Sequence, residues 1–563
     1  MVPNLSALLA RAAVFHSTRF DKVTHHVRQT QTACLQDILR YSGNGAIARD
    51  LRVSERTPED VFRREVPVQS YAAFAPYAER IANGEKNVVS KEDVLFMATS
   101  SGTTGTRKLL PITKTVHRVR QRARMASAGY LVRGLTKRHL PHGRIMITSS
   151  AAMMGETSGG IPFGFTSACV HNMNRSKYSA RIVTPYPFDV MAIPGVRERH
   201  IMSFLFALRD PKLRFIAGNF PPFLLHIAAQ LNEEAPMLIE ALRTGGVPDG
   251  VVLNERTHRK LAKSLRADPQ RAEVLARIFE RDGRLDPGSV WPGLTALFTS
   301  LGDASTPYLP SIKKVFGDKP LFGGLYSATE SVFGVNTEID DGSSTLAIGS
   351  AYFEFVPRDQ WDQECPESVL PHEVEVGQEY RIIVTNYHGL MRYDIGDIVR
   401  ITGWHNTTPK LTFLRRRGGA LNATHEMTTE ADIDLALRDV EVRLGCAFHQ
   451  VGVTLRTNLN GMSRYFWLVE FAGSAPDLNI LAASLDAALS RSNLAYAERR
   501  KDYIPEPVVA LLPTGTLRSL KRGDPGKLTD AALKGHRILY GNPAVEGLSS
   551  KAIATSTGYF PAQ

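Results

Sequence analysis

The sequence predicts an α/β protein with a large N-terminal domain and a smaller C-terminal α+β domain. Between residues 94 and 399, short apolar runs alternate with longer segments of helical periodicity, a pattern typical of buried strands joined by helices. Strands follow one another closely over residues 346–401, which predicts a β-rich subdomain within the large domain. After Phe413 a cluster of arginines and glycines interrupts the pattern, and a shorter set of helices and strands begins.

Helices are expected before the first apolar run. One apolar helical face carries Leu5, Leu8, Leu9, Ala12 and Phe15, and a second stripe carries Leu35, Ile38 and Leu39. The strands predicted for the large domain cover residues 94–98, 144–148, 213–217, 296–299, 321–325 and 380–385, and one connecting helix includes residues 272–279.

The C-terminal part is expected to fold separately. A helix capped by Thr429, with Ile433, Leu437, Val440 and Leu444 facing inward, begins soon after the arginine cluster. Strands at residues 449–455, 465–471 and 508–512 and a helix near 480–489 complete the α+β pattern. We therefore predict a large domain over residues 1–415, a hinge over 416–422 and a small domain over 423–563.

The composition indicates a soluble globular protein and excludes several other classes. Of the 563 residues, 43% are hydrophobic and 22% are charged, and no run of 18 apolar residues that could span a membrane occurs. The net charge of +12 is spread along the chain, without zinc-finger spacing or interleaved aromatics. The cysteines, Cys34, Cys169, Cys365 and Cys446, form no Cys-x-x-Cys pair. We expect a cytoplasmic protein that binds neither nucleic acid nor a membrane.

The most informative segment is rich in glycine and small hydroxyl residues, follows the strand predicted at residues 94–98 and precedes a helical pattern. It contains Ser100, Ser101, Gly102, Thr103, Thr104 and Gly105, and Lys108 comes three residues later. Backbone N–H groups and hydroxyls in such a loop can approach phosphate oxygens, and a lysine supplies positive charge. It is not a Walker loop, because the spacing of its glycines and lysine differs. A surface turn is the alternative for this segment alone.

Two later segments bring aromatic, hydroxyl and carboxylate groups to the ends of predicted strands. The first contains Tyr326, Ser327, Ala328, Thr329 and Glu330, and the second runs from Arg392 through Tyr393 and Gly396 to Asp397. An aromatic ring can stack on adenine, one carboxylate can hold Mg²⁺, and another can accept both ribose hydroxyls. Taken alone, Tyr326 also fits a core position, Glu330 a helix N-terminus and Asp397 a turn. In this order, the three segments together predict a nucleotide site.

In order and spacing these segments resemble the nucleotide-binding motifs of adenylate-forming enzymes, and most closely those of the Gretchen Hagen family of auxin-responsive acyl acid amido synthetases, with the chain as a bacterial-type member. They resemble, in turn, the family's Ser-Ser-Gly-Thr phosphate loop, its Tyr-Ala-Ser-Ser-Glu motif and its Tyr-Arg-x-Gly-Asp region. Trp291-Pro292, residues 159–162 and residues 413–417 also fit the family. The resemblance therefore covers nearly the whole chain.

The resemblance implies a large N-terminal domain built from α/β sheets and a β-barrel, and a small mobile C-terminal domain. It implies ATP, Mg²⁺, an acyl acid and an amino acid as partners, with the oligomeric state left open. The acyl carboxylate would attack the α-phosphorus of ATP and release pyrophosphate, and an amine would then attack the acyl adenylate and release AMP. No covalent enzyme nucleophile is needed, in agreement with a sequence that lacks Gly-x-Ser-x-Gly.

The same resemblance assigns roles to particular residues. Lys108 and the loop of Ser100, Ser101, Gly102, Thr103 and Thr104 would bind the phosphates. Glu330 would bind Mg²⁺, Tyr326 with Ser327, Ala328 and Thr329 would hold adenine, and Asp397 would hold ribose. Arg416 in the hinge would contact ribose or phosphate. Lys534 is the candidate for a lysine that the small domain brings to the site, with Lys527 and Lys521 as rivals and a solvated basic tail as the alternative.

Two positions depart from the family pattern. The residues of the acyl pocket are not identified by the motifs. Met427 stands where plant members have a lysine after the hinge, and Ala328-Thr329 replaces Ser-Ser. The helix after the phosphate loop carries Arg118, Arg120, Arg122 and Arg124, one of which could hold the acyl carboxylate, and a solvated helix face is the alternative. Neither the acid nor the amino acid can be named from the sequence.

Two other functions compete with amide synthesis. An acyl-coenzyme A ligase would share the adenylation step and would use a thiol as acceptor. A catalytically inactive nucleotide-binding scaffold would keep the glycine turn but would not need Lys108, Glu330 and Asp397 together.

Overall fold

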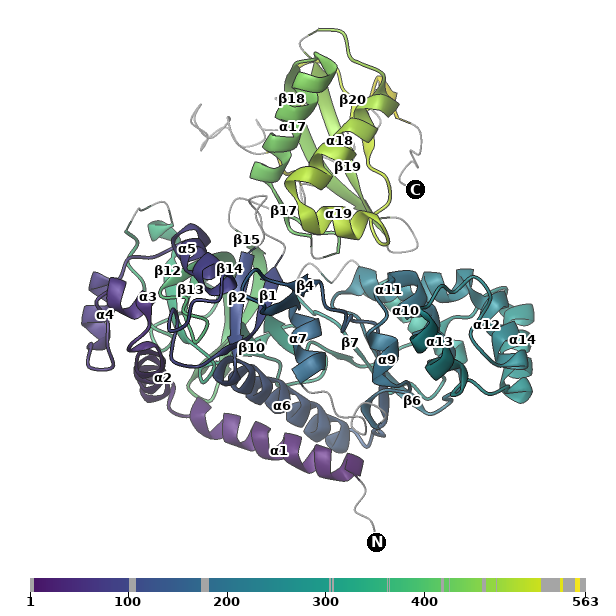
Figure 1. The fold of residues 1–563 in the computed structure, drawn as a ribbon, viewed down its shortest axis with the longest axis horizontal. Coiled ribbons are helices and arrows are strands. Elements are labelled where there is room, and N and C mark those ends of the chain that lie inside the picture. The colour runs from purple at the N-terminus through teal and green to yellow at the C-terminus, as the bar shows by residue number, and fades with distance from the viewer. Residues whose placement is uncertain are drawn as a thin grey trace. The chain divides into compact units, whose positions relative to one another are not determined.

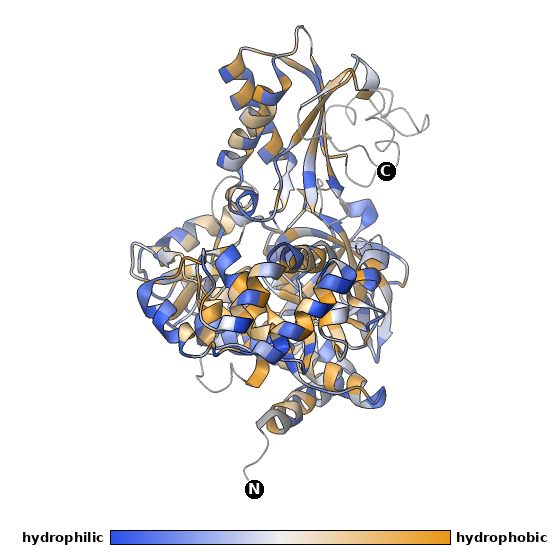
Figure 2. Ribbon diagram, turned by 90° about the vertical axis from the view of Figure 1, so that its right-hand side faces the viewer, coloured by the Kyte–Doolittle hydropathy of each residue, from blue (hydrophilic) through white to orange (hydrophobic). Residues whose placement is uncertain are grey.

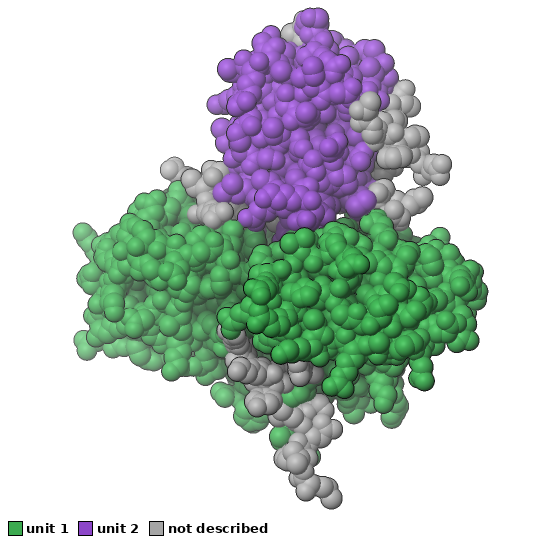
Figure 3. All heavy atoms as spheres, turned by 45° about the vertical axis from the view of Figure 1, so that its right-hand side comes forward, with its two compact units in different colours: residues 1–100, 108–414 green, residues 101–107, 415–563 purple. Residues whose placement is uncertain are grey.

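The computed structural model describes residues 5–100, 108–173, 182–302, 305, 308–361, 363, 365–416, 420–424, 426–457, 462–471, 473–517, 537–539 and 552–556. The chain divides into two compact units, coloured green and purple in Figure 3. Unit 1 takes in residues 1–100 and 108–414, and unit 2 contains the described residues from 415 onward. Each unit contains both helices and strands, so the predicted mixed α/β fold, with a large N-terminal and a smaller C-terminal domain, is confirmed.

Helices begin unit 1, as expected (Figure 1). They are α1 (Leu5–Thr24), α2 (Val27–Ser42), α3 (Ala46–Asp50), α4 (Glu59–Glu65) and α5 (Tyr71–Ala82). The stripe predicted on α2 is confirmed, since Leu35, Ile38 and Leu39 are buried and belong to one of the two main hydrophobic cores of the unit.

The apolar face predicted for α1 is wrong. Leu8, Leu9, Ala12 and Phe15 are exposed, whereas Ala13 and Ser17 are buried. α1 packs along α6 (Lys114–Lys137), and a Cβ on Gly129 of α6 would meet the carbonyl oxygen of Ala13 at 2.1 Å. Because an approach this close admits only small side chains, the large apolar residues of α1 are turned away from the contact.

A four-stranded sheet in the order β2-β1-β5-β4 carries the first motif. β1 (Val94–Ser100) pairs antiparallel with β2 (Lys108–Thr113) and parallel with β5 (Pro162–Phe165), which pairs with β4 (Gly155–Glu156). α7 (Thr166–Met173) follows β5 directly and packs against β1. The motif strand β1 is therefore central in its sheet.

A second sheet contains parallel strands joined by helices, the arrangement predicted for the large domain. Its order is β3 (Arg144–Ile147), β6 (Leu213–Ala217), β7 (Ala296–Phe298) and β8 (Leu321–Phe322), with each neighbouring pair parallel. The helices are α9 (Phe188–Met191), α10 (Val196–Leu208), α11 (Pro221–Glu233), α12 (Ala235–Thr244), α13 (Glu255–Ala262), α14 (Pro269–Asp282), α15 (Pro287–Val290) and α16 (Leu309–Phe316). They pack around a separate core that includes Trp291.

The β-rich region forms a seven-stranded sheet in the order β12-β13-β14-β15-β11-β10-β9. The bounds are β9 (Leu325–Ser327), β10 (Val332–Val335), β11 (Ser344–Leu346), β12 (Tyr352–Pro357), β13 (Glu379–Thr385), β14 (Tyr393–His405) and β15 (Thr408–Arg416), and a 3-10 helix, η2 (Arg358–Gln360), follows β12. The strand predicted at 380–385 belongs to this sheet and not to the parallel one. Among the described residues, no pairing joins β12 to β9, and α2 packs on β12, where the resemblance implied a closed barrel.

Unit 2 is the expected α+β fold. Its sheet has the order β18 (Phe448–Thr457), β19 (Ser463–Phe471), β20 (Val508–Leu511) and β21 (Ala554–Thr555). The helices beside it are α17 (Glu430–Leu444), α18 (Leu478–Ser492) and α19 (Leu494–Arg500). A small hairpin of β16 (Ala420–Leu421) and β17 (Thr428–Thr429) comes before α17. The predicted cap is confirmed, because Thr429 and Asp432 form a capping box. Figure 2 colours the helices of this unit in alternating orange and blue, as expected for amphipathic helices on a core.

Candidate active site

The first motif lies in the hairpin between β1 and β2. Ser100 and Lys108 are paired directly across these strands, so the intervening loop begins and ends at neighbouring backbone positions. Ser101, Gly102, Thr103 and Thr104, and also the side chain of Ser100, lie outside the described residues. The helical pattern does not follow the loop at once, because β2 comes before α6. Lys108 is thus the first residue of a strand, a position that the sequence pattern did not reveal.

Two tyrosines surround the Lys108 ammonium group. Lys108 Nζ lies 3.4 Å from the hydroxyl of Tyr393, to which it donates, and 5.4 Å from the ring centroid of Tyr71. The Tyr71 hydroxyl accepts from the Leu109 N–H at 2.7 Å and donates to the Leu109 carbonyl at 3.1 Å, which holds the backbone next to Lys108. Burial raises the pKa of Tyr71 to about 12, and the nearby Glu330 carboxylate adds to this shift. Tyr71 stood in no recognisable motif, so the sequence could not point to it.

The second motif lies in the hairpin between β9 and β10. Its turn is closed by a hydrogen bond from the Ala328 N–H to the Ser331 carbonyl at 2.9 Å. Glu330 is therefore in a tight turn and not at a helix N-terminus. The Glu330 residue is 4% exposed, and its backbone carbonyl accepts from the Asn386 side chain at 2.9 Å.

Helix α6 holds this second hairpin in place. The Arg120 guanidinium donates to the carbonyls of Ala328 at 2.9 Å and Thr329 at 3.1 Å, and the Ser127 hydroxyl donates to the carbonyl of Gly324 at 2.8 Å. Burial lowers the pKa of Arg120 to about 10, with the neighbouring Arg124 charge as a further cause. Since it is tied to the backbone of the motif, Arg120 orients the turn that carries Glu330.

A hydrogen bond joins the second motif to the third. The Tyr326 hydroxyl donates to a carboxylate oxygen of Asp397 at 2.7 Å, and the Tyr326 ring stacks on Phe333 with a centroid distance of 5.1 Å. Asp397 lies on β14 and is 3% exposed. Tyr326 is only half-buried, so its ring does not behave as an ordinary core side chain. The structure brings the predicted adenine and ribose residues into direct contact.

Arg392 of the third motif is a structural anchor. Its guanidinium makes two hydrogen bonds of 3.0 Å to the buried carboxylate of Glu354 and a third, of 2.7 Å, to the Val66 carbonyl. The backbone of Arg392 is left-handed, with φ of 45°. The bidentate pair stabilises this unfavourable conformation just before the strand that carries Asp397.

The metal prediction rests on a single carboxylate. No cluster of three or more His, Cys, Asp or Glu side chains occurs in the part of the chain that the structure describes. A site of one carboxylate suits Mg²⁺, which is commonly held by one or two carboxylates, water and the substrate's own phosphates. Glu330 fits such a role, because its hydrogen bond with Asn386 is through its backbone carbonyl and its carboxylate pairs with no described residue.

The four arginines of α6 differ sharply in their surroundings. Arg118 and Arg122 are exposed, as a solvated helix face would be, and Arg120 is tied to the second motif. Arg124 remains partly exposed although burial lowers the pKa of its guanidinium. It donates to the Gln121 side chain, and no carboxylate among the described residues pairs with it. Of the four, Arg124 has the surroundings expected of an anion-binding group.

The predicted hinge and mobile-domain residues are described only in part. Arg416 is the last residue of β15 and is half-buried. Met427, where plant relatives were expected to carry lysine, has a left-handed backbone with φ of 47°. Lys534 and its rivals Lys527 and Lys521 lie outside the described residues.

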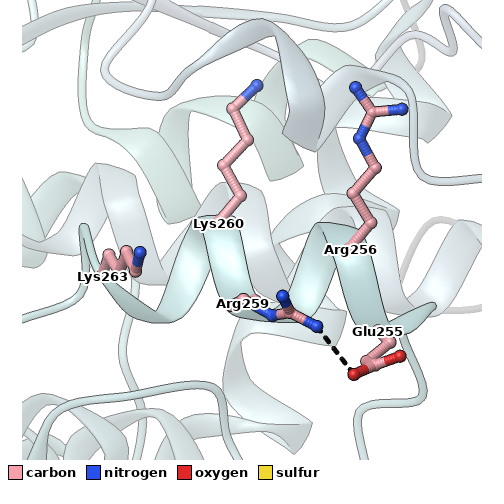
Figure 4. Close-up of a pocket in the computed structure, with 5 residues that line it drawn as sticks. All are labelled: Glu255, Arg256, Arg259, Lys260 and Lys263. Atoms are coloured by element: carbon pink, nitrogen blue, oxygen red, sulfur yellow. Dashed lines mark hydrogen bonds and ion pairs between the residues drawn. The ribbon is translucent and has the colours of Figure 1, made fainter.

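A hollow of about 290 Å³ lies away from these motif residues, on the surface of α13 (Figure 4). It is lined by Glu255, Arg256, Arg259, Lys260 and Lys263, all of them exposed. Arg259 pairs with Glu255 at 2.7 Å and Lys260 with Asp189 at 2.6 Å. The hollow contains none of the predicted site residues. No helix among the described residues is long and apolar enough to cross a membrane.

The fold of the chain is similar to that of two solved enzymes. The solved GH3.15 acyl acid amido synthetase matches 97% of this chain and 98% of its own, with a TM-score of 0.65 and 20% identity. A solved 2-hydroxyisobutyryl-CoA ligase matches 91% of this chain and 89% of its own, with a TM-score of 0.52 and 14% identity. At such identities, the similarity shows a shared fold.

The family models show that the chain belongs to the GH3 family. The GH3 family N-terminal domain matches residues 16–321, and the GH3 family central domain matches residues 344–416. The chain is 26% identical over 444 residues to the indole-3-acetic acid-amido synthetase GH3.3 of Arabidopsis thaliana, covering 76% of this chain and 73% of that protein. It is also 26% identical over 437 residues to the jasmonoyl–L-amino acid synthetase JAR4 of Nicotiana attenuata, covering 74% of each. The family predicted from the sequence is confirmed.

Proposed function

We propose that the protein is an ATP-dependent acyl acid amido synthetase. It adenylates a carboxylic acid with release of pyrophosphate, and an amino acid amine then displaces AMP to leave an amide. The observation that carries this proposal is the hydrogen bond from Tyr326 to Asp397, which unites the adenine and ribose motifs. The named relatives are amino acid-conjugating synthetases, which supports the second half of the reaction.

The adenylation step follows from the charges at the site. The hydroxyls and backbone of residues 100–104 and the Lys108 ammonium bind the phosphates, and Lys108 stabilises negative charge as pyrophosphate leaves. The Tyr71 ring and the Tyr393 hydroxyl keep Lys108 in position. Glu330 would hold Mg²⁺, which when bound neutralises phosphate charge. Asp397 accepts the ribose hydroxyls, with adenine beside Tyr326 and residues 327–329.

Arg124 holds the acyl carboxylate before attack. A guanidinium offers paired donors that match a carboxylate, and this one lacks a carboxylate partner among the described residues. Arg120, one helical turn earlier, already binds the carbonyls of the second motif. The acid is thereby oriented toward the nucleotide by a rigid helix, which favours attack by positioning.

The second step uses the small domain. We propose a large domain over residues 1–415, a hinge over 416–422 and a small domain over 423–563. Arg416 contacts ribose or phosphate in one domain orientation, and Lys534 reaches the site when the small domain turns. The substrates are small molecules, and the chemistry needs no nucleic acid or membrane. A cytoplasmic location fits cysteines that are all free among the described residues.

The test is Mg²⁺-dependent exchange of labelled pyrophosphate into ATP by the purified protein, with a panel of aromatic, indolyl and aliphatic acids. Exchange that requires one acid, followed by amino acid-dependent AMP release and a product with the mass of the amide, is the expected result. Adenylate formation without any amide, across all twenty amino acids, would overturn the amide-forming step.

An acyl-coenzyme A ligase is the second candidate, because the 2-hydroxyisobutyryl-CoA ligase shares the fold. Product formation that requires coenzyme A and ignores amino acids would establish it. ATP binding without pyrophosphate exchange for any acid would instead indicate a catalytically inactive nucleotide-binding scaffold.

A further inference from the structure

The turn that carries Glu330 is held by two buried side chains from other parts of unit 1. The carbonyls of Ala328 and Thr329 accept from Arg120, and the carbonyl of Glu330 itself accepts from the Asn386 side chain at 2.9 Å. Arg120 and Asn386 are both buried, so water does not compete for these hydrogen bonds. All three successive carbonyls of the turn are thus bound by donors of the protein.

Asn386 is itself fixed by a second turn, between β13 and β14. Its backbone N–H donates to the Leu390 carbonyl at 2.9 Å, and its carbonyl accepts from the Gly389 N–H at 3.2 Å. In its side chain, Oδ1 accepts from the His388 N–H at 2.9 Å, and the amide nitrogen donates to Glu330. Because both ends of the side-chain amide are bonded, the donor that holds Glu330 has one defined position.

The turn of Asn386 is also tied to the strand that begins at Lys108. The Nδ1 of His388, a buried ring, lies 3.0 Å from the carbonyl of Pro111 on β2. A carbonyl can only accept, so this nitrogen is the donor. The turn is tightly packed as well, since a Cβ on Gly389 would meet the Ile47 side chain at 2.9 Å.

These contacts connect two sheets. β2 belongs to the four-stranded sheet, and the β9–β10 hairpin that carries Glu330 belongs to the seven-stranded sheet. The pairing within either sheet therefore does not set the distance between Lys108 and Glu330. The Asn386 turn binds Glu330 through one side chain and β2 through another. Such positions matter, because a misplacement of about 1 Å can cost about 10² in rate.

We propose that Asn386 and His388 are positioning residues that set the Glu330 carboxylate relative to the phosphate-binding strand β2. Asn386 holds the backbone of Glu330, and His388 fixes the turn of Asn386 to β2. This inference rests on the proposed adenylation function, in which Glu330 would hold Mg²⁺. It names two residues outside the three motifs on which the metal-dependent part of nucleotide binding depends.

The test measures the affinity for ATP by isothermal titration calorimetry, once with excess Mg²⁺ and once with EDTA. The wild-type protein is expected to bind ATP more tightly with Mg²⁺. Asn386→Leu removes the donor to Glu330 and should weaken binding in Mg²⁺ about tenfold or more, the loss typical when a residue that orients a metal ligand is removed. Its affinity in EDTA should stay near the wild-type value, whereas a general defect in packing would weaken binding in both conditions.

Two substitutions of His388 test the link to β2. His388→Leu removes the donor to Pro111 and should weaken binding in Mg²⁺ in the same selective way. His388→Asn should restore much of that affinity, because an asparagine amide can donate from a position close to that of Nδ1. This pair decides the inference if Asn386→Leu does not fold.

Asn232→Leu is the matched control. Asn232, on α11, likewise donates to a backbone carbonyl, that of Ala228 at 3.1 Å, and accepts from a backbone N–H, that of Leu285. It lies among the helices around the parallel sheet, where none of the motif turns is held. The control is expected to keep both wild-type affinities.

The outcomes separate this inference from the proposed function. Asn386→Leu and His388→Leu that bind ATP as the wild type does, or that lose affinity equally in Mg²⁺ and in EDTA, would overturn the inference and leave the proposed function intact. Wild-type binding that Mg²⁺ does not strengthen would overturn the metal role of Glu330 and this inference with it. Pyrophosphate exchange, measured separately, decides the proposed function.

Discussion

The neighbours of Lys108 restrict the position of its charged side chain. Two tyrosines from distant parts of the chain, Tyr71 and Tyr393, contact its ammonium group, and Tyr71 also binds the adjoining backbone at Leu109. A lysine side chain is flexible, so contacts of this kind reduce the freedom that must be lost when phosphate binds.

Lys108→Ala should slow adenylation by about 10² or more, because a preorganised charge on the leaving phosphates is removed. Pyrophosphate exchange at saturating ATP measures this. Lys114→Ala, which changes an exposed lysine at the start of α6, is the control and should retain the wild-type rate. An unchanged rate in Lys108→Ala would remove this residue from the mechanism.

Asp432 in unit 2 gives a pH dependence of stability. Burial raises its pKa to about 6 from 3.8, and one carboxylate oxygen has no hydrogen-bond partner among the described residues. Between pH 4 and 6 the unfolded chain ionises while the folded carboxyl stays protonated. Stability therefore falls as pH rises through this range, by up to about 3 kcal/mol at 1.36 kcal/mol per pH unit, and stays lower above it.

Asp432→Asn should abolish this fall while keeping an acceptor for the capping box. Urea unfolding of both proteins at a series of pH values from 4 to 8 measures the difference between them. Asp439→Asn changes a partly exposed carboxylate on the same helix, and Arg443 and Arg491 lower the pKa of this carboxylate, so the effect should be small and opposite in sign. Parallel stability curves for wild type and Asp432→Asn would contradict the assignment.

At the scale of elements, the contact between α1 and α6 explains why the apolar face predicted for α1 is wrong. The large apolar residues of α1 predicted a buried face, but Gly129 lets α6 approach the backbone of α1 at Ala13 and so selects the small-residue face. The buried face predicted for α2 is correct, because α2 packs on a β-sheet, where large side chains fill the space.

Gly129→Ala should destabilise the protein by about 1–3 kcal/mol, although alanine favours a helix by about 1 kcal/mol, because the added methyl would meet backbone atoms that cannot move alone. Thermal unfolding measures the change. In the control Gly134→Ala, on the same helix, the added methyl group would meet the end of the Ile339 side chain, which can rotate. This control should therefore lose less stability. Equal stability of the two variants would show that α1 can shift away from the added methyl group at little cost in stability.

At the scale of the whole molecule, the proposed mobile small domain implies that the two half reactions need different groups. Lys534→Ala should impair one half reaction at least tenfold more than the other, because a residue carried on a mobile domain acts in one orientation. Pyrophosphate exchange reports the first half, and amide formation from preformed acyl adenylate reports the second. Lys527→Ala and Lys521→Ala are the comparison variants. Equal effects of Lys534→Ala on both halves would exclude this role.

The sequence by itself determined the class of fold and the family, and it named the residues of the three predicted nucleotide motifs. These depend on local order: hydrophobic periodicity reports buried faces, and motif residues near strand ends lie close in the sequence. Tyr326, Glu330 and Asp397 could therefore be named before any geometry was known.

Only the tertiary structure decided which of those residues meet and how. It brought Tyr326 to Asp397 and Tyr71 to Lys108, and it placed Glu330 in a turn. It also separated Arg124 from the exposed Arg118 and Arg122 and from Arg120, which is bound to the backbone of the second motif. The physical reason is that burial and partner choice depend on elements far apart in the chain. Periodicity along one helix shows which residues share a face, but not which neighbour that face will meet.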